Sequence, residues 1–226
     1  MIAPLATGLV AGAVHVWSGP DHLVAIAPLS VRQPRRAWVP GVRWGIGHSA
    51  GVGIVGGLSL LLRDLLPVEQ LSLWGELLVG VLLIGIGIWA FRKASRVHFP
   101  TAAPAHDGTP HVHGHAHDSA SSPERRTAHH QAHAALGIGI LHGLAGSSHF
   151  LAVLPVLALP TRTQATGYLI AYAVGTIASM ALFSWAMGWL GTRFKASGPA
   201  LYRSLMYGCA FAAIAVGIYW IITGFP

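Results

Sequence analysis

Six residues in or beside apolar stretches of the sequence are candidate metal ligands. They are His15, Asp21, His22, His48, His142 and His149. Placing such groups in a membrane is costly, so they usually mark a site or a pathway. Imidazole nitrogens with a carboxylate suit Ni²⁺, Co²⁺, Zn²⁺ or Fe²⁺, whereas an all-oxygen set favours Mg²⁺ or Ca²⁺ and thiolates favour Cu⁺. The set therefore predicts a site for a divalent transition metal.

Each of these residues also has a simpler interpretation. An isolated histidine such as His48 can be a helix-packing residue that is hydrogen-bonded to a neighbour, or a proton relay. Asp21 can be the N-cap of the helix that follows it. The metal-site hypothesis depends on the residues as a group, because burying all of them without a function would be expensive.

The spacing of the first three candidates favours a break in their helix. In an unbroken helix, His15 and His22 would be about 10.5 Å apart along the axis, and Asp21 and His22 would point about 100° apart. Ligands roughly 2 Å from one ion fit that arrangement poorly. Gly19-Pro20 lies between them. Since proline lacks a backbone donor and glycine tolerates unusual dihedral angles, the helix is predicted to unwind there.

The residues around His15 recur in the second half of the chain. His15–Pro28 aligns with His142–Pro155 without a gap, at a constant offset of 127 residues. Both histidines, one glycine, one alanine and the final proline coincide. Shared small residues alone can reflect close helix packing, but the paired histidines and proline favour a duplication. Gly146-Ser147-Ser148 is expected to weaken the second copy where Gly19-Pro20 breaks the first.

The apolar segments that position these residues predict an all-α membrane protein of about six transmembrane helices. Of the 226 residues, 53% are hydrophobic and only 9% are charged, against about 25% charged in a typical soluble domain. About 20 apolar residues span the hydrocarbon core as a helix. The predicted segments are Ile2–Leu29, Gly41–Leu62, Leu73–Phe91, Ala134–Leu159, Thr166–Leu190 and Leu201–Thr223.

Each copy of the repeat contains three of these segments, so the second copy must enter the membrane from the opposite side. We therefore expect residues 1–92 and 134–226 to form a 3+3 inverted repeat with broken first and fourth helices. A loop at 93–133 would join them. Inverted repeats recur in secondary transporters, whose substrate sites lie near the membrane midplane at interrupted helices.

The basic residues predict the orientation of the chain. All but two of the 14 Lys and Arg residues lie on the side of the central loop; the exceptions are Arg63 and Arg162. The positive-inside rule then predicts a multi-pass protein of the cell (inner) membrane, with both termini outside and the loop in the cytoplasm. Met1–Pro4 has no basic residue, so no cleavable signal peptide is expected.

The central loop contains nine of the 14 histidines and is otherwise rich in Ala, Pro and Ser. Its low hydrophobicity predicts no fixed fold. Four histidines alternate strictly: His111, His113, His115 and His117. In an extended chain they would project to one face and form a weak trap for transition metals. A solvated low-complexity linker is the alternative interpretation.

These motifs resemble the UreH-like membrane family, which is related to the nickel/cobalt transporter (NiCoT and NicO) group. The likeness covers nearly the whole chain apart from the loop. It is carried by His15…Gly19-Pro20-Asp21-His22-Leu23, by Gly47-His48 and by His142-Gly-Leu-Ala-Gly146-Ser. Five residues separate His15 from Asp21-His22, where the NiCoT signature has four, as fits the UreH-like branch. The resemblance implies Ni²⁺ or Co²⁺ transport, with His15, Asp21 and His22 as metal-site residues and His48 as a less specific match.

The function predicted is a secondary transporter of a divalent transition metal. Nickel or cobalt is expected first, and zinc or iron next. The ion would be the transported substrate, and no tightly bound cofactor and no enzymatic activity are expected. Its partners would be the ion and the lipid bilayer. Proton coupling is expected because histidine must be deprotonated to bind metal. The sequence leaves the oligomeric state open, with a homo-oligomer as one alternative.

Other functions lack the residues that they need. Cys209 is the only cysteine, which excludes a thiol-redox conductor of the CcdA type with two intramembrane cysteines. No HExxH motif occurs and no glutamate lies near the candidates, which disfavours a metal-dependent membrane enzyme. The basic residues are not interleaved with aromatic ones as in a nucleic-acid groove. The sequence does not exclude one alternative function, that of an accessory metal-binding subunit of another permease.

Overall fold

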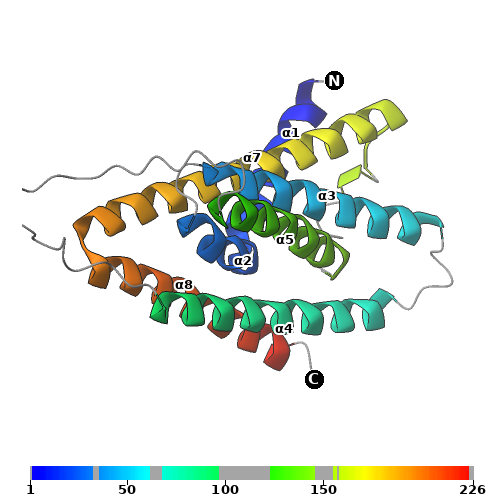
Figure 1. The fold of residues 1–226 in the computed structure, drawn as a ribbon. Helices are drawn as coiled ribbons and strands as arrows, with labels where there is room; N and C mark the ends of the chain where they lie inside the picture. The colour runs from blue at the N-terminus through cyan, green and yellow to red at the C-terminus, as the bar shows by residue number, and fades with distance from the viewer. Residues whose placement is uncertain are drawn as a thin grey trace, which may run out of the picture.

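The helix that carries the first candidate residues is broken, as predicted. The computed structural model describes residues 2–32, 36–61, 68–96, 123–145, 155–156 and 158–223. In it, α1 spans Ile2–Ser18 and α2 spans Pro20–Val31, with a bend of 75° between them (Figure 1). Gly19 is extended, with φ −96° and ψ 98°. Pro20 begins α2, where its missing N–H costs no helical hydrogen bond.

The later helices extend beyond the predicted segments at several ends. They are α3 (Trp38–Leu61), α4 (Val68–Ser95), α5 (Pro123–Ala145), α7 (Arg162–Ser197) and α8 (Pro199–Thr223). α5 begins at Pro123 instead of Ala134, within the range predicted as a loop. Proline suits the first helical turn, and the Glu, Arg, Ala and Gln residues that follow favour a helix. The break predicted at residues 146–148 lies outside the described residues.

The described helices form an all-α membrane protein. Three of them are long and apolar enough to cross a bilayer alone: Trp74–Ser95 within α4, α7 and α8. The bent pair α1 and α2 is a fourth candidate span, and His133–Ala145 is a shorter apolar helix. Large apolar side chains such as Leu78, Ile170 and Phe211 are exposed on the outside of the bundle. A surface of this kind requires lipid in place of water.

The helices of the two halves pack against each other in long pairs. α1 lies along α7, α3 lies along both α5 and α7, and α4 lies along α8 (Figure 1). Glycines allow close approach at these contacts, as is common between membrane helices. A Cβ atom added at Gly80 would lie 2.8 Å from the Gly217 carbonyl oxygen, and one added at Gly217 would lie 2.6 Å from that of Gly80. The backbones of α4 and α8 therefore touch at this level.

Helix α2 is enclosed by the other helices. It contacts α3, α4, α7 and α8, and all but three of its 12 residues are buried. Ile26 and Leu29 join the apolar cluster around Trp44, whereas Ala25 joins the cluster around Leu83. The short helix after the break is therefore held inside the bundle, and the residues in its first turn are positioned by tertiary packing.

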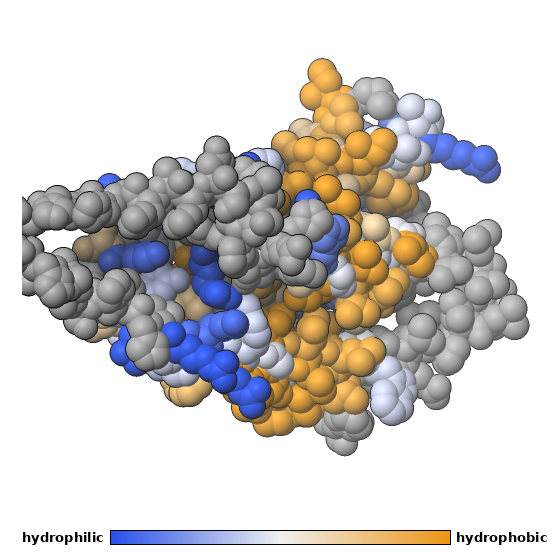
Figure 2. Space-filling view, viewed as in Figure 1, coloured by the Kyte–Doolittle hydropathy of each residue, from blue (hydrophilic) through white to orange (hydrophobic). Residues whose placement is uncertain are grey.

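Most of the described basic residues gather at one end of the bundle. Arg92 and Lys93 end α4, Lys195 ends α7, and Arg203 lies near the start of α8. One apolar cluster joins the end of α2, the end of α4 and the start of α8. Figure 2 shows hydrophilic residues at this end and a broad hydrophobic surface beside them. A membrane-spanning bundle is expected to have this distribution, because its ends face water and its sides face lipid.

Candidate metal centre

Four helices bring five of the six candidate residues together. His15 lies in the last turn of α1, and Asp21 and His22 lie in the first turn of α2. His48 comes from the middle of α3, and His142 comes from the last turn of α5. The bend at Gly19 turns α2 back toward α1. The imidazoles of His15 and His22 can thus meet, although six residues lie between them in sequence.

Three imidazoles converge through their Nε2 atoms. Nε2 of His15 lies 3.0 Å from Nε2 of His22 and 3.2 Å from Nε2 of His48. Each imidazole nitrogen carries either one hydrogen or one lone pair. The single Nε2 of His15 therefore cannot make a conventional hydrogen bond to both neighbours. Three lone pairs directed at one cation would account for all of these contacts.

The spacing of these nitrogens fits metal coordination. Two nitrogens that each lie about 2.0–2.1 Å from one ion are about 2.9 Å apart at an octahedral angle and about 3.4 Å apart at a tetrahedral angle. The two Nε2 separations of 3.0 and 3.2 Å lie between these limits. One ligand atom from each of His15, His22 and His48 lies within 4.8 Å of the others. This set can hold a divalent transition metal and leave coordination positions open.

Asp21 joins the two halves of the chain at this site. Its carboxylate accepts a hydrogen bond from Nδ1 of His22 at 3.0 Å through one oxygen, and one from Nε2 of His142 at 2.8 Å through the other. When Nδ1 of His22 carries the hydrogen, Nε2 of His22 carries the lone pair that a metal needs. A carboxylate behind a metal-binding histidine fixes the tautomer and the ring orientation in this way.

A second arrangement of ligands uses some of the same residues. Asp21, His22 and His142 also offer ligand atoms within 4.8 Å of one another. The two groups share His22. The contacts of Asp21, at 3.0 Å and 2.8 Å, have the lengths of N–H···O hydrogen bonds, so both of its oxygens already serve as acceptors. For this reason we take the three Nε2 atoms as the ligand set and Asp21 as its support.

The residues of the site are deeply buried except for His15. His22 and His142 are each 2% exposed and His48 is fully buried, while His15 is half-buried. Trp44 is fully buried and stacks on His48, with ring centroids 4.7 Å apart and planes at 8°. A low-polarity surrounding of this kind strengthens the attraction between the Asp21 carboxylate and a cation bound by the neutral imidazoles.

Trp44 also lies against two further histidines, although sequence reasoning did not select it. Its ring centroid is 5.3 Å from that of His22 and 5.4 Å from that of His142. Its position, one helical turn before His48 on α3, was the available signal, because residues four apart share a helix face. Indole is not a metal ligand, so a search for ligand types passes over it.

The remaining predicted ligands are not described. His149 falls among residues 146–154, and the proposed loop trap of His111, His113, His115 and His117 falls among residues 97–122; both ranges lie outside the described part of the chain. Their participation stays a prediction. Among the described residues, His142 is the one predicted ligand that the second half of the chain contributes to the site.

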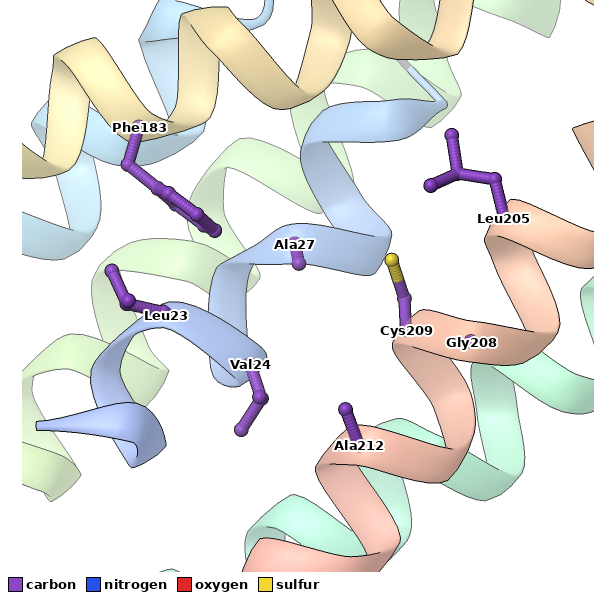
Figure 3. Close-up of a pocket in the computed structure, with 8 residues that line it drawn as sticks. All are labelled: Leu23, Val24, Ala27, Phe183, Leu205, Gly208, Cys209 and Ala212. Carbon is purple, nitrogen blue, oxygen red and sulfur yellow. The ribbon is translucent and has the colours of Figure 1, made fainter. Parts of the chain in front are cut away.

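An apolar pocket lies on another side of α2. It has a volume of about 270 Å³ and is lined by Leu23, Val24 and Ala27 of α2, by Phe183 of α7 and by residues of α8 (Figure 3). The sulfur of Cys209 is the only side-chain heteroatom among the labelled residues. Since this chain has a single cysteine, it cannot form an intramolecular disulfide here.

Comparison with known proteins places the chain in a family of membrane proteins. The family described as "cytochrome C biogenesis protein transmembrane region" matches residues 23–219. The chain belongs to this family. The match begins inside α2 and continues almost to the end of α8. The two-cysteine chemistry considered above is nevertheless impossible within this chain, because Cys209 has no second cysteine.

Named relatives extend over nearly the whole chain. The chloroplast proteins FOR GROWTH AND FERTILITY 2 and 1 of Arabidopsis thaliana are each 34% identical over 220 residues, or 97% of this chain, which spans 56% and 59% of their own lengths. The urease accessory protein UreH of Bacillus sp. (strain TB-90) is 26% identical over 233 residues, covering 97% of this chain and 91% of UreH. The predicted resemblance to the UreH-like family is thereby confirmed. No solved structure matches the chain.

Proposed function

We propose that this protein is a secondary transporter of divalent transition-metal ions, with nickel or cobalt as the first candidates. The observation that carries the proposal is the convergence of the Nε2 atoms of His15, His22 and His48 at 3.0 and 3.2 Å inside a bundle of membrane helices. Imidazole ligands suit nickel, cobalt, zinc and iron. The name of the relative UreH, a urease accessory protein, supports a nickel-related role.

The roles of the site residues follow from their contacts. His15, His22 and His48 are the ligands. Asp21 orients His22 by accepting its Nδ1 hydrogen, and His142 holds Asp21 from the other half of the chain. Histidine binds metal only when it is deprotonated, so loading of the site releases protons wherever these residues were protonated. Protons are for this reason the natural counter-ions of transport.

The internal repeat supplies a means of alternating access. A Cβ added to a glycine would collide with a carbonyl oxygen in four corresponding places: Gly12 with Tyr172, Gly175 with Leu9, Gly139 with Trp44, and Gly47 with Leu136. Gly139 and Leu136 follow Gly12 and Leu9 at the offset of 127 that aligns the two repeats. The packing of α1 on α7 is thus repeated by α5 on α3. Two related units around a midplane site can rock against each other and open it to each side in turn.

Flux through a reconstituted membrane tests the proposal. The purified full chain is inserted into liposomes that contain a metal-sensitive dye, and Ni²⁺ or Co²⁺ is added outside. We expect entry above that of protein-free liposomes, and a decrease of at least about tenfold for His22→Ala, which removes a ligand. His133→Ala removes an exposed histidine of α5 outside the cluster and should leave entry unchanged.

Metal binding without flux would favour the alternative function, in which this protein is an accessory metal-binding subunit of another permease. Equilibrium dialysis of the same preparations measures binding separately. If the wild type binds Ni²⁺ but adds no flux, the transporter proposal fails and the metal site stands. If His22→Ala binds as tightly as the wild type, the assignment of the site itself is wrong.

A further inference from the structure

A groove between α2, α4 and α5 combines two cations with apolar walls. It has a volume of about 640 Å³, within the range of small-molecule sites. Arg32, just after α2, and Lys93, near the end of α4, lie in its lining together with Trp89. The other described residues of its lining are apolar or glycine, with Val81, Leu82 and Ile86 among those of α4. The groove is separate from the His cluster and needs its own explanation.

Arg32 is held in place but retains an unused donor. Its guanidinium carbon lies 5.2 Å from the centroid of the Trp89 ring, a cation–π contact. Its Nη1 nitrogen is buried and makes no hydrogen bond within the described part of the chain. No salt bridge joins Arg32 or Lys93 to a carboxylate among the described residues. A buried donor without an acceptor costs free energy, so this position favours an anionic ligand that supplies one.

The charges of the groove exclude it as a metal pathway. Among the described residues, its lining contains neither a carboxylate nor an imidazole, and two cations repel a divalent ion. An anion with oxygen acceptors is complementary to them. Guanidinium groups bind phosphate oxygens in a bidentate manner, and lysine binds them as a point charge.

The length and position of the groove fit a phospholipid. Val81 and Lys93 are 12 residues apart on α4, or about 18 Å along the helix. Half of the roughly 30 Å hydrocarbon core is about 15 Å. The two cations lie at the basic end of the bundle, which the positive-inside rule assigns to the cytoplasm. Anionic lipids are abundant in that leaflet, and basic pockets between membrane helices bind their headgroups.

We propose that this groove binds an anionic phospholipid. The headgroup phosphate lies between Arg32 and Lys93, and an acyl chain follows the apolar wall of α4 toward Val81. Because Leu29 and Arg32 line the groove, the bound lipid contacts the C-terminal end of α2, whose first turn carries Asp21 and His22. The lipid thereby connects α2 to α4 and α5.

Retention of defined lipids by the purified full chain tests this proposal. The detergent-solubilised protein is incubated with palmitoyl-oleoyl phosphatidylglycerol or with phosphatidylcholine of the same acyl chains, and bound lipid is counted by native mass spectrometry. We expect phosphatidylglycerol to be retained more strongly. In the double variant Arg32→Gln, Lys93→Gln, the ratio of retained phosphatidylglycerol to retained phosphatidylcholine should fall about fivefold for each removed charge.

Two further variants separate this groove from general surface charge. Arg193 lies 5.2 Å over Trp189, the same cation–π distance, but both residues are exposed and outside the groove. Arg193→Gln should therefore keep the preference. A Cβ added at Gly85 would meet nothing within 4 Å, so Gly85→Leu fills the groove without a backbone clash and should reduce retention while both cations remain.

Three results would overturn the proposal. The first is equal retention of the two lipids by the wild type. The second is an unchanged preference in both the charge variant and Gly85→Leu, as a groove covered by another segment of this chain would give. The third is an increase in melting temperature with inorganic phosphate that equals the increase with phosphatidylglycerol, which would identify a phosphate site without an acyl-chain site.

Discussion

Asp21 is the residue on which the two halves of the chain meet. It accepts hydrogen bonds from His22 and His142, and it is 5% exposed. A carboxylate accepts both hydrogens, whereas the amide of asparagine accepts through only one atom. The replacement Asp21→Asn therefore releases one of the two histidines with almost no change in size.

We predict that Asp21→Asn weakens metal affinity about 10- to 100-fold, the usual cost of losing a carboxylate behind a metal-binding histidine. Isothermal titration with Ni²⁺ measures this. If His142 acts only through Asp21, the variants His142→Ala and Asp21→Asn are coupled and the double variant loses less than the product of the two effects. Independent effects would instead make His142 a ligand in its own right.

The members of the site could be predicted from residue types, but their roles could not. The histidines and the aspartate of the apolar segments predict six residues, and the structure brings five of them together: His15, Asp21, His22, His48 and His142. The sixth, His149, lies outside the described residues. Which nitrogen each imidazole directs at the centre depends on hydrogen bonds across 121 residues, as between Asp21 and His142. No local pattern encodes that. Trp44 was missed for a different reason, since its contribution is packing.

At the scale of elements, the break between α1 and α2 determines whether the site exists. Gly19 is required there by space, although its extended backbone would suit any residue. A Cβ at this position would overlap the His22 ring at Nδ1 and would lie 2.9 Å from Oδ1 of Asp21. The smallest side chain would thus displace the very contact that orients His22.

We predict that Gly19→Ala reduces metal affinity by about tenfold or more while the protein still folds, because the moved ring belongs to one side chain and the φ of Gly19, −96°, suits any residue. The matched control is Gly137→Ala on α5, where an added Cβ meets nothing within 4 Å. Titration with Ni²⁺ and thermal unfolding are compared for both variants. Equal affinities in the two variants would contradict the assigned geometry.

The helices themselves were largely predictable, because each apolar segment carries its own signal. The sharp bend at Gly19-Pro20 was predicted from the two residues that cause it. The start of α5 at Pro123 was not, because hydropathy marks only apolar segments and the first turns of this helix are polar. Partner choice among helices was also beyond the sequence. The pairing of α1 with α7 and of α3 with α5 depends on complementary glycine surfaces, and small residues occur on almost every helix of this chain.

At the scale of the whole molecule, α7 is long enough to cross the complete bilayer. It runs for 36 residues from Arg162 to Ser197, or about 54 Å, which exceeds the roughly 40–45 Å of a complete bilayer. Its two ends therefore reach opposite aqueous faces. Most of the described basic residues lie at the end near Lys195, where α2 and α4 finish and α8 begins.

We predict that the Lys195 end faces the cytoplasm, because basic loops are retained there during insertion. With Cys209 replaced by alanine, single cysteines are placed at Thr163 and at Ser197, which are exposed near the two ends of the same helix. A membrane-impermeant maleimide should label Thr163→Cys in intact cells and Ser197→Cys only after permeabilisation. The reverse pattern would invert the topology. It would also move the cations of the phospholipid groove, Arg32 and Lys93, to the outer leaflet, and the anionic lipids of the cytoplasmic leaflet could then not reach them.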